Sequence, residues 1–272
     1  MDQLTNSNRD LEGRVALITG SANKAGIGMG VSRSLASQGC RIAVSDLAFR
    51  GEELAADIEA LTQDYGVEAM SVSIDVSDQK SVDSGVAAVI DRFRRLDIAV
   101  NNAGTVFGAP SPLHSYEEAE WSRTLDVNLN GTLRVSKAAV TAMTDGGSIV
   151  NISSMAGKVP APSNGAYSVS KAAIMMLTRV MAVELAPRGI RVNAVCPGLI
   201  DTDLQRLNVA LKAHVAGVDD VEAERRMIEG VPIGRMGTIE EVGELCAFLA
   251  SDRSSYLTGQ SINATGGLLT AI

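Results

Sequence analysis

The sequence predicts one α/β domain, with a doubly wound, parallel sheet of seven strands and helices on both faces. Two observations support this fold class. Short runs rich in β-branched residues alternate along most of the 272 residues with segments that carry apolar residues at helical spacing. The predicted strands are apolar throughout, which is typical of a sheet covered on both faces, and helical crossovers imply parallel neighbours.

Seven segments are predicted as strands, at residues 14–19, 41–46, 69–75, 97–104, 148–154, 190–198 and 261–267. Segments such as VSRSLASQG and AAIMMLTRVMAVELAPRG supply the helices between them. The chain has no internal repeat and no linker, so residues 1–272 are interpreted as a single domain.

One segment, residues 201–230, is polar and helix-prone and contributes no strand. Ligands bind beyond the carboxyl ends of the strands in an open α/β sheet. We therefore expect this segment to be a lid over a substrate rather than a separate domain.

Composition excludes several classes of function. The chain carries a net charge of −8 and no basic run, so a nucleic-acid partner is not expected. It has no apolar stretch long enough to span a membrane and no secretory signal, which predicts a cytoplasmic protein. The three cysteines are widely spaced among apolar residues and are predicted as buried thiols, and with two histidines no metal site is expected.

A glycine-rich turn, TGSANKAGIGMG, follows the apolar run RVALI and opens a predicted helix. Its glycines stand at 20, 26, 28 and 30, so it does not match the spacing G-x-G-x-x-G. Small residues at a helix N-terminus still allow a pyrophosphate to approach the backbone. Asp46, 20 residues after Gly26, is placed to accept a hydrogen bond from an adenosine ribose 2′-hydroxyl. The alternative is an ordinary tight connection between strand and helix.

Tyr167 and Lys171 are four residues apart on a predicted helix, so their side chains share one face. A cation close to a phenol favours the phenolate and lowers the phenol's pKa, which would suit Tyr167 to proton transfer near neutral pH. Ser154, 13 residues earlier at a predicted strand end, can donate a hydrogen bond to a substrate oxygen. The alternative for Tyr167 and Lys171 is a solvated pair on a helix surface.

Five further motifs follow the glycine turn in order: NNAG (101–104), DVNLNG (126–131), NISS (151–154), YSVSK (167–171) and PGLIDT (197–202). With them the chain resembles the short-chain dehydrogenase/reductase family over nearly all of residues 12–267, which implies a Rossmann-type domain. The family's turn is T-G-x-x-x-G-x-G, and this chain has two additional residues between Gly20 and Gly26. It also has Thr265 where family members often carry an aspartate before the terminal Gly-Gly.

The resemblance implies a catalytic set of Asn128, Ser154, Tyr167 and Lys171. Hydride would pass between C4 of a nicotinamide and a carbinol carbon, with Tyr167 as general acid or base. Lys171 would also bind the nicotinamide ribose, and Asn128 would hold a water that links Lys171 to solvent.

The glycine turn, Asp46 and the resemblance together give the expected cofactor-binding residues: Gly20, Asn23, Gly26, Ile27, Gly28, Asp46, Leu47, Asp75, Val76, Asn102, Ala103, Gly104, Tyr167, Lys171, Pro197, Gly198, Ile200 and Thr202. Because the Asp46 carboxylate repels a 2′-phosphate, NAD is the expected cofactor. Lys24 and Arg50 are the counter-argument, since cations there could neutralise that phosphate, and NADP is the second choice.

The substrate is expected to be a small polar secondary alcohol, such as a polyol or sugar-like hydroxy compound, because the predicted lid has few bulky apolar residues. The expected substrate contacts are Ser154, Asn164, Tyr167, Arg206 and His214, and the alternative for the last two is a solvated helix face. Two alternatives are an NADPH-dependent 3-oxoacyl thioester reductase and a non-catalytic nucleotide-binding regulator.

The segment from Tyr167 to Ala186 is rich in apolar residues on more than one side, which suggests a second buried face and hence a homo-oligomer. Family members commonly form tetramers, so the resemblance implies a tetramer. The apolar tail GGLLTAI is a further candidate for a subunit contact.

Overall fold

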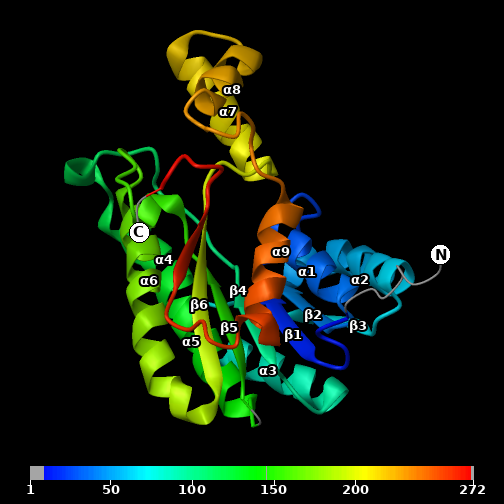
Figure 1. Ribbon diagram of the computed structural model, residues 1–272. Coiled ribbons are helices and arrows are strands. Elements are labelled where there is room, and N and C mark those ends of the chain that lie inside the picture. The colour runs from blue at the N-terminus through cyan, green and yellow to red at the C-terminus, as the bar shows by residue number, and fades with distance from the viewer. Residues whose placement is uncertain (1–8, 145, 271–272) are drawn as a thin grey trace, which may run out of the picture.

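The computed structural model describes residues 9–144 and 146–270 and contains a seven-stranded, fully parallel sheet in the order β3-β2-β1-β4-β5-β6-β7 (Figure 1). The strands are β1 (Val15–Thr19), β2 (Arg41–Asp46), β3 (Ala69–Ser73), β4 (Ile98–Asn101), β5 (Gly147–Ile152), β6 (Ile190–Pro197) and β7 (Ser261–Ala264). The predicted fold class is confirmed. Most predicted strands extend past the observed carboxyl ends, and the extra residues form the loops of the candidate site.

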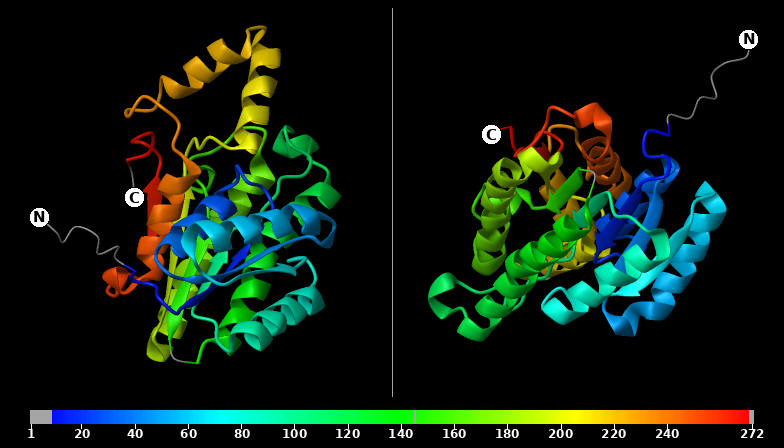
Figure 2. Two further views of the ribbon diagram at one scale, coloured as in Figure 1. Left: turned by 90° about the vertical axis from the view of Figure 1, so that its right-hand side faces the viewer. Right: turned by 90° about the horizontal axis from the view of Figure 1, so that it is seen from below.

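Nine α-helices lie in the described part of the chain. They are α1 (Ile27–Ser37), α2 (Gly51–Tyr65), α3 (Gln79–Phe93), α4 (Glu118–Leu125), α5 (Gly131–Ala142), α6 (Gly165–Leu185), α7 (Asp203–Ala216), α8 (Asp220–Ile228) and α9 (Ile239–Ala250). Helices α1, α2 and α9 cover one face of the sheet, and α3, α5 and α6 cover the other (Figures 1 and 2).

Alternation along each strand divides the core into two layers. Ala16 and Ile18 of β1 pack with α1, α2 and α9, whereas Val15 and Leu17 pack with α3, α5 and α6. All four side chains are fully buried. Successive strand residues point to opposite faces, and both faces are covered, so the strand sequence is apolar without a break. The three cysteines are buried free thiols, as predicted.

Helices α7 and α8 form a hairpin that projects beyond the sheet and stands away from the body of the domain (Figures 1 and 2). The hairpin has a small apolar core of its own, formed by Val209, Ala213 and Ala223 with Val218, Met227 and Met236. These two helices make up most of the segment that the sequence predicts as a lid. None of the helices in the described residues combines the length and hydropathy needed to cross a bilayer.

The last glycine of the glycine-rich turn is Gly30, and its surroundings explain why the position has no side chain. It lies in α1, and a Cβ atom on it would stand 2.4 Å from the carbonyl oxygen of Ile239 at the start of α9. That separation is far inside van der Waals contact, so Gly30 lets α1 and α9 approach closely. This glycine therefore serves helix packing.

We expect Gly30→Ala to lower the free energy of unfolding by about 1–3 kcal/mol, because the backbone of α9 must shift to admit the methyl group. Gly51→Ala is the matched control, since a Cβ on Gly51 at the start of α2 meets nothing within 4 Å and its φ is −59°. Urea titration of both variants measures the effect. Equal stability of Gly30→Ala and wild type would contradict the packing role of Gly30.

Candidate active site

The four residues predicted for catalysis come from three segments that pack together at the carboxyl edge of the sheet. Asn128 lies in a π-helical turn (Asp126–Asn130) between α4 and α5, and Ser154 follows β5 directly. Tyr167 and Lys171 occupy successive turns at the start of α6. Both the π-helical turn and the short helix Met155–Gly157 after Ser154 pack against α6.

Ser154 and Tyr167 are in contact. The Ser154 hydroxyl hydrogen-bonds to the Tyr167 side chain, which lowers the pKa of the phenol, but burial outweighs that effect and raises the pKa above its usual value. The Ser154 Oγ also accepts from the Ala156 backbone N–H at 3.1 Å, which fixes its orientation. The phenol of the half-buried Tyr167 is therefore neutral at neutral pH.

Lys171 is 3% exposed, and its Nζ donates to the Ile152 carbonyl at 2.8 Å, at the end of β5. Its Nζ lies 5.4 Å from the centroid of the Tyr167 ring. Burial lowers the pKa of Lys171 to about 8, so the side chain is mainly cationic at neutral pH. Burial of the phenol raises the pKa of Tyr167, and in this structure the Lys171 ammonium is directed to the Ile152 carbonyl, so the expected lowering of that pKa by Lys171 stays a prediction.

Asn128 is fully buried and braces the loop that follows β4. Its Oδ1 accepts from the Thr105 N–H at 2.8 Å, and its Nδ2 donates to the Thr105 carbonyl at 2.9 Å and to the Ser170 Oγ at 3.0 Å. The side chain therefore ties the loop to α6. Ser170, inside the YSVSK motif, is a functional contact that the sequence analysis did not single out.

The glycine turn has the close packing that a phosphate cradle needs. Gly20 has a φ of +69°, and a Cβ on Gly28 would stand 2.6 Å from the Asn102 Nδ2 and 2.8 Å from the Gly20 carbonyl. Gly26 precedes the first residue of α1, Ile27. Backbone at a helix N-terminus, with no side chains in the way, suits a pyrophosphate, so these residues fit a dinucleotide.

The loops after β1 and β4 hold each other in place. The Asn102 Nδ2 donates to the carbonyls of Thr19 at 2.9 Å and Gly20 at 2.8 Å, and the Thr19 Oγ1 accepts from the N–H groups of Asn102 and Ala103. Gly104 lies beside the catalytic end, since a Cβ on it would stand 3.4 Å from the Lys171 Nζ. The predicted cofactor residues of these two loops therefore lie together.

Asp46 and the loop after β3 carry residues predicted for the adenosine end of the cofactor. The Asp46 Oδ2 accepts from the Ala22 N–H at 2.9 Å, and its Oδ1 accepts from the Leu47 N–H at 2.8 Å. Asp75 accepts from Ser77 and so shapes the turn that carries Val76.

Arg134, which no sequence motif indicated, supports this adenosine end from α5. It donates to the Val76 carbonyl at 3.1 Å and pairs with Asp126 at 2.7 Å. Through these two contacts it joins the loop after β3 to the π-helical turn that carries Asn128.

The residues after β6 lead into α7. The Gly198 N–H donates to the Ala264 carbonyl at 2.9 Å, and Ile200 bridges to Gly237. The Thr202 Oγ1 accepts from the Gln205 N–H at 3.2 Å and thereby caps α7. Pro197 is the last residue of β6.

The predicted substrate contacts are only partly brought together. Asn164 directly precedes α6, which carries Tyr167, and bridges to Ser111. Arg206 is exposed and pairs with Asp201 and Asp203, and His214 is exposed in the last turn of α7. Neither of these two lid residues contacts the catalytic set in this structure.

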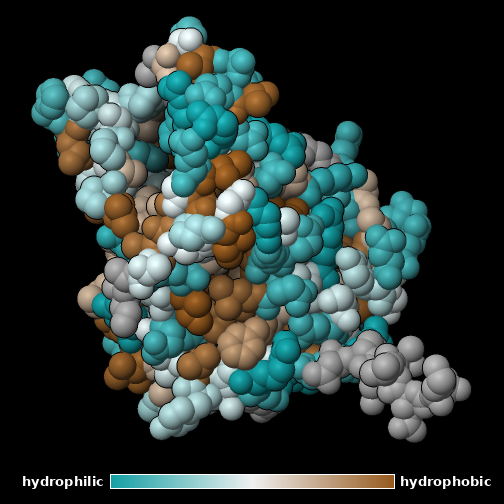
Figure 3. Space-filling view, turned by 45° about the horizontal axis from the view of Figure 1, so that its top comes forward, coloured by the Kyte–Doolittle hydropathy of each residue, from teal (hydrophilic) through white to brown (hydrophobic). Residues whose placement is uncertain are grey.

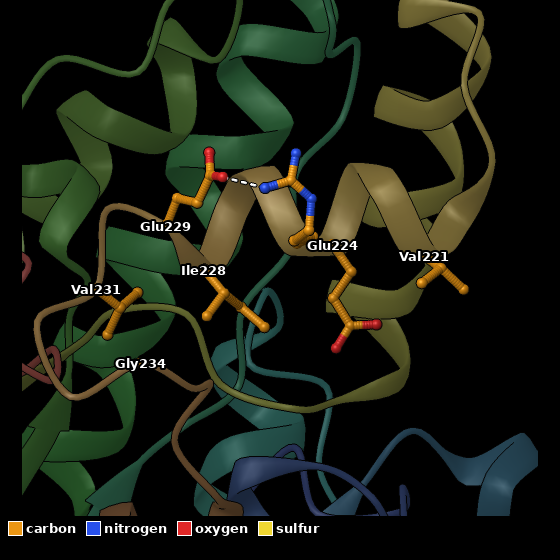
Figure 4. A pocket seen from close by; sticks show the side chains of 7 residues that line it. Val221, Glu224, Ile228, Glu229, Val231 and Gly234 are labelled. Atoms are coloured by element: carbon orange, nitrogen blue, oxygen red, sulfur yellow. Dashed lines mark hydrogen bonds and ion pairs between the residues drawn. The ribbon is translucent and has the colours of Figure 1, made fainter.

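The lid also bears a hollow of its own, between α8 and the segment that follows it (Figure 4). Apolar Val221, Ile228 and Val231 line it together with Glu224, and an ion pair between Arg225 and Glu229 lies at its side. Below the lid, apolar side chains gather on the face of the domain (Figure 3). In the described residues, no group of three His, Cys, Asp or Glu is placed to hold a metal ion.

Comparisons with known proteins agree with this geometry. A family model described as enoyl-(acyl carrier protein) reductase matches residues 20–269. Cis-4-hydroxycyclohexanecarboxylate dehydrogenase of Sinomonas cyclohexanicum is 40% identical over 261 residues, covering 93% of this chain and 96% of that protein.

Two solved structures are similar over almost the whole chain. NAD+-bound xylitol dehydrogenase has a TM-score of 0.87 at 36% identity, covering 94% of this chain and 99% of that one. Actinorhodin polyketide ketoreductase with NADPH has a TM-score of 0.88 at 33% identity, covering 97% of this chain and 100% of that one.

The buried ammonium of Lys171 predicts a stability that depends on pH. Burial lowers its pKa from 10.5 to about 8. Below pH 8 the group is charged in both the folded and the unfolded chain, and the penalty for burying the charge is complete. Between pH 8 and 10.5 the unfolded chain binds more protons than the folded one, so the stability contributed by this group rises with pH.

We therefore expect Lys171→Met to raise the free energy of unfolding at pH 7 by about 1–3 kcal/mol, which is the pKa shift at about 1.4 kcal/mol per unit less the lost hydrogen bond. The difference in free energy of unfolding between Lys171→Met and wild type should shrink as pH rises from about 8 to 10.5. Denaturant titrations at several pH values measure it, with exposed Lys137→Met as the control. A difference between Lys171→Met and wild type that stays constant with pH would contradict the assignment.

Proposed function

The chain belongs to the short-chain dehydrogenase/reductase family, and on that premise we propose that it is an NAD-dependent oxidoreductase that interconverts a small polar secondary alcohol and its ketone. The observation that carries this proposal is the contact of Ser154 with a half-buried Tyr167, beside the buried ammonium of Lys171. Such a set holds a proton donor and a cation at the edge of the sheet where ligands bind.

Ser154 and Tyr167 have different roles in the proposed transfer of a proton to and from the substrate oxygen. NAD, when bound, supplies the nicotinamide carbon that accepts the hydride from the alcohol carbon. Ser154 donates a hydrogen bond to the substrate oxygen and orients it toward Tyr167. During oxidation the Tyr167 oxygen takes the hydroxyl proton of the alcohol, and during reduction it returns that proton to the ketone oxygen.

Lys171 has two proposed tasks. Because burial raises the pKa of Tyr167, the phenolate needs a nearby cation, and each pKa unit recovered corresponds to about 1.4 kcal/mol. The ammonium, with its pKa of about 8, is present at neutral pH to supply that stabilisation. It would also donate to the nicotinamide ribose hydroxyls. Asn128 would hold the water that connects Lys171 to solvent.

NAD is proposed because the Asp46 carboxylate stands at the end of β2, where the family places the adenosine ribose. Its oxygens are already oriented by the Ala22 and Leu47 N–H groups. A 2′-phosphate would meet this carboxylate as a like charge in a half-buried site. The similar solved structures include both an NAD+ and an NADPH complex, so Asp46 is the feature that favours NAD here.

A polyol or sugar-like substrate is favoured by the polar lid, whose exposed face carries many charged side chains. Xylitol dehydrogenase is among the similar structures, and a hydroxycyclohexanecarboxylate dehydrogenase is among the relatives. Asn164, Arg206 and His214 remain the proposed substrate contacts, and the two lid residues would reach the substrate only after the lid moves.

One observation favours a second candidate, an NADPH-dependent 3-oxoacyl thioester reductase. Leu204 and Leu207 of α7 are 59% and 69% exposed, and Ile233 is 65% exposed, so apolar surface is available to a longer substrate. A polyketide ketoreductase is also among the similar structures. A screen of alcohols and ketones with both cofactors separates the two candidates. The third reading, a non-catalytic nucleotide-binding regulator, predicts no turnover in that screen.

We expect Tyr167→Phe to lower kcat by at least about a hundredfold while NAD affinity changes little, because the substitution removes only the proton path. Tyr256→Phe is the matched control, since Tyr256 is fully exposed. Steady-state rates and fluorescence titration with NADH measure the two effects. If the Tyr167 variant kept a tenth or more of the wild-type kcat, another residue would have to carry the proton.

We also propose a homo-oligomer, with a tetramer as the expected form, in a cytoplasmic protein. On α6 the apolar side chains of Val169, Met176, Val180 and Val183 are 45%, 55%, 45% and 78% exposed. Their spacing of seven, four and three residues puts them in one stripe along the helix. A second copy of the chain would cover this stripe. Of the apolar tail, Ala271 and Ile272 lie outside the described residues, so its proposed subunit contact stays a prediction.

Light scattering at micromolar concentration should therefore give a mass well above 28.4 kDa. Val183→Glu should reduce that mass, because it places a charge in the stripe on α6. Val221→Glu on the lid, where the valine is 77% exposed, should leave the mass unchanged. A monomeric wild type would rule out the oligomer.

A further inference from the structure

The backbone N–H and the backbone carbonyl of Ala22 both fix the lengthened loop between Gly20 and Gly26 to the end of β2. The Ala22 N–H donates to the Asp46 Oδ2 at 2.9 Å, and the Ala22 carbonyl accepts from the Arg50 side chain at 3.2 Å. The loop is thus held where the adenosine ribose is expected, with Asp46 facing it. Arg50, one of the two cations that could favour a 2′-phosphate, directs its Nη2 to this carbonyl.

Lys24 is the other cation, and no other Lys or Arg lies between Gly20 and Gly26. Its Nζ lies 3.8 Å from the Asp57 Oδ1 on α2. The Lys24 side chain is 68% exposed, but Asp57 is only 3% exposed. Because Asp57 is withdrawn from water, its attraction for Lys24 is screened less than that of a surface carboxylate.

The position of Asp57 connects the Lys24–Asp57 ion pair to nucleotide binding. The carboxylate belongs to α2, outside the glycine turn and outside the end of β2, and it reaches the turn through Lys24. Lysine has a long, flexible side chain that can reach alternative partners when one is removed. What Lys24 does near a 2′-phosphate therefore depends on whether Asp57 holds it.

We propose that Asp57 is a positioning residue that sets cofactor choice by holding and neutralising Lys24, so that the ribose end of the site presents the Asp46 carboxylate rather than a cation. This inference rests on the nucleotide dependence proposed above. It assigns the preference for NAD to two carboxylates: Asp46 repels a 2′-phosphate directly, and Asp57 withholds the loop cation that would attract it.

The test uses two fragments, adenosine 5′-monophosphate and adenosine 2′,5′-bisphosphate, whose binding by calorimetry needs no substrate and no turnover. Wild type should bind the monophosphate more tightly, by about tenfold. Asp57→Asn should improve the bisphosphate relative to the monophosphate by about fivefold or more, with the gain lost at high salt. Asp64→Asn, which removes an exposed carboxylate from the same helix, should leave the ratio unchanged.

A double variant identifies the cation. In Asp57→Asn, adding Lys24→Met should restore the wild-type ratio, because the released ammonium is what binds the phosphate. If Asp57→Asn leaves the ratio within about twofold of wild type, at a fold verified by thermal unfolding, the proposal is overturned. If wild type prefers the monophosphate and only this variant fails to respond, the proposed NAD dependence stands while the role of Asp57 does not.

Two further outcomes are decisive. If wild type binds neither fragment, the proposed nucleotide dependence fails and this inference fails with it. If Asp57→Asn does not fold, Lys24→Met in the wild-type background replaces it. The ratio should then change by less than about twofold, and a fivefold loss of bisphosphate affinity would show that Lys24 was already available to the phosphate, which overturns the proposal.

Discussion

Parallel pairing is the constraint on which the rest of this structure depends. A strand can return parallel to its neighbour only after a crossover, so every loop that follows a strand must emerge at the same edge of the sheet. Five segments that are far apart in the chain meet at that edge for this reason alone. They are the glycine turn, Asp46, the loop after β4, Ser154 and the residues after β6. Covering both faces with helices then leaves this edge as the place where polar groups can face a ligand.

Several buried polar side chains inside this edge donate hydrogen bonds to one another. Asn101 donates to both Ser136 and Asn151, and Asn151 donates to Thr178, in a chain of contacts from 2.7 to 2.9 Å that joins β4, β5, α5 and α6. Lys171 continues the pattern with the Ile152 carbonyl. A buried ammonium with a pKa of about 8 costs folding free energy, and that cost is consistent with a group kept for chemistry rather than for stability.

Each of three charged side chains at the predicted adenosine end also has a specific partner. Asp46 accepts from two backbone N–H groups, Arg50 donates to the Ala22 carbonyl, and Lys24 pairs with the buried Asp57. The net charge counted from the sequence therefore does not describe the electrostatic potential that a bound nucleotide would meet at this site. A cation counts for a ligand only when it is not already neutralised.

The sequence by itself determined the sheet and its seven strands and indicated four candidate catalytic side chains, because apolar periodicity and fixed spacing are local properties of the chain. Only the tertiary structure decided that Asn128 braces Thr105 and Ser170, that Gly30 serves the packing of α1 on α9, and that Asp57 holds Lys24. It also decided that Tyr167 lies where burial raises the pKa of the phenol. Burial and partnership between distant segments set these properties, and both exist only once the chain has folded.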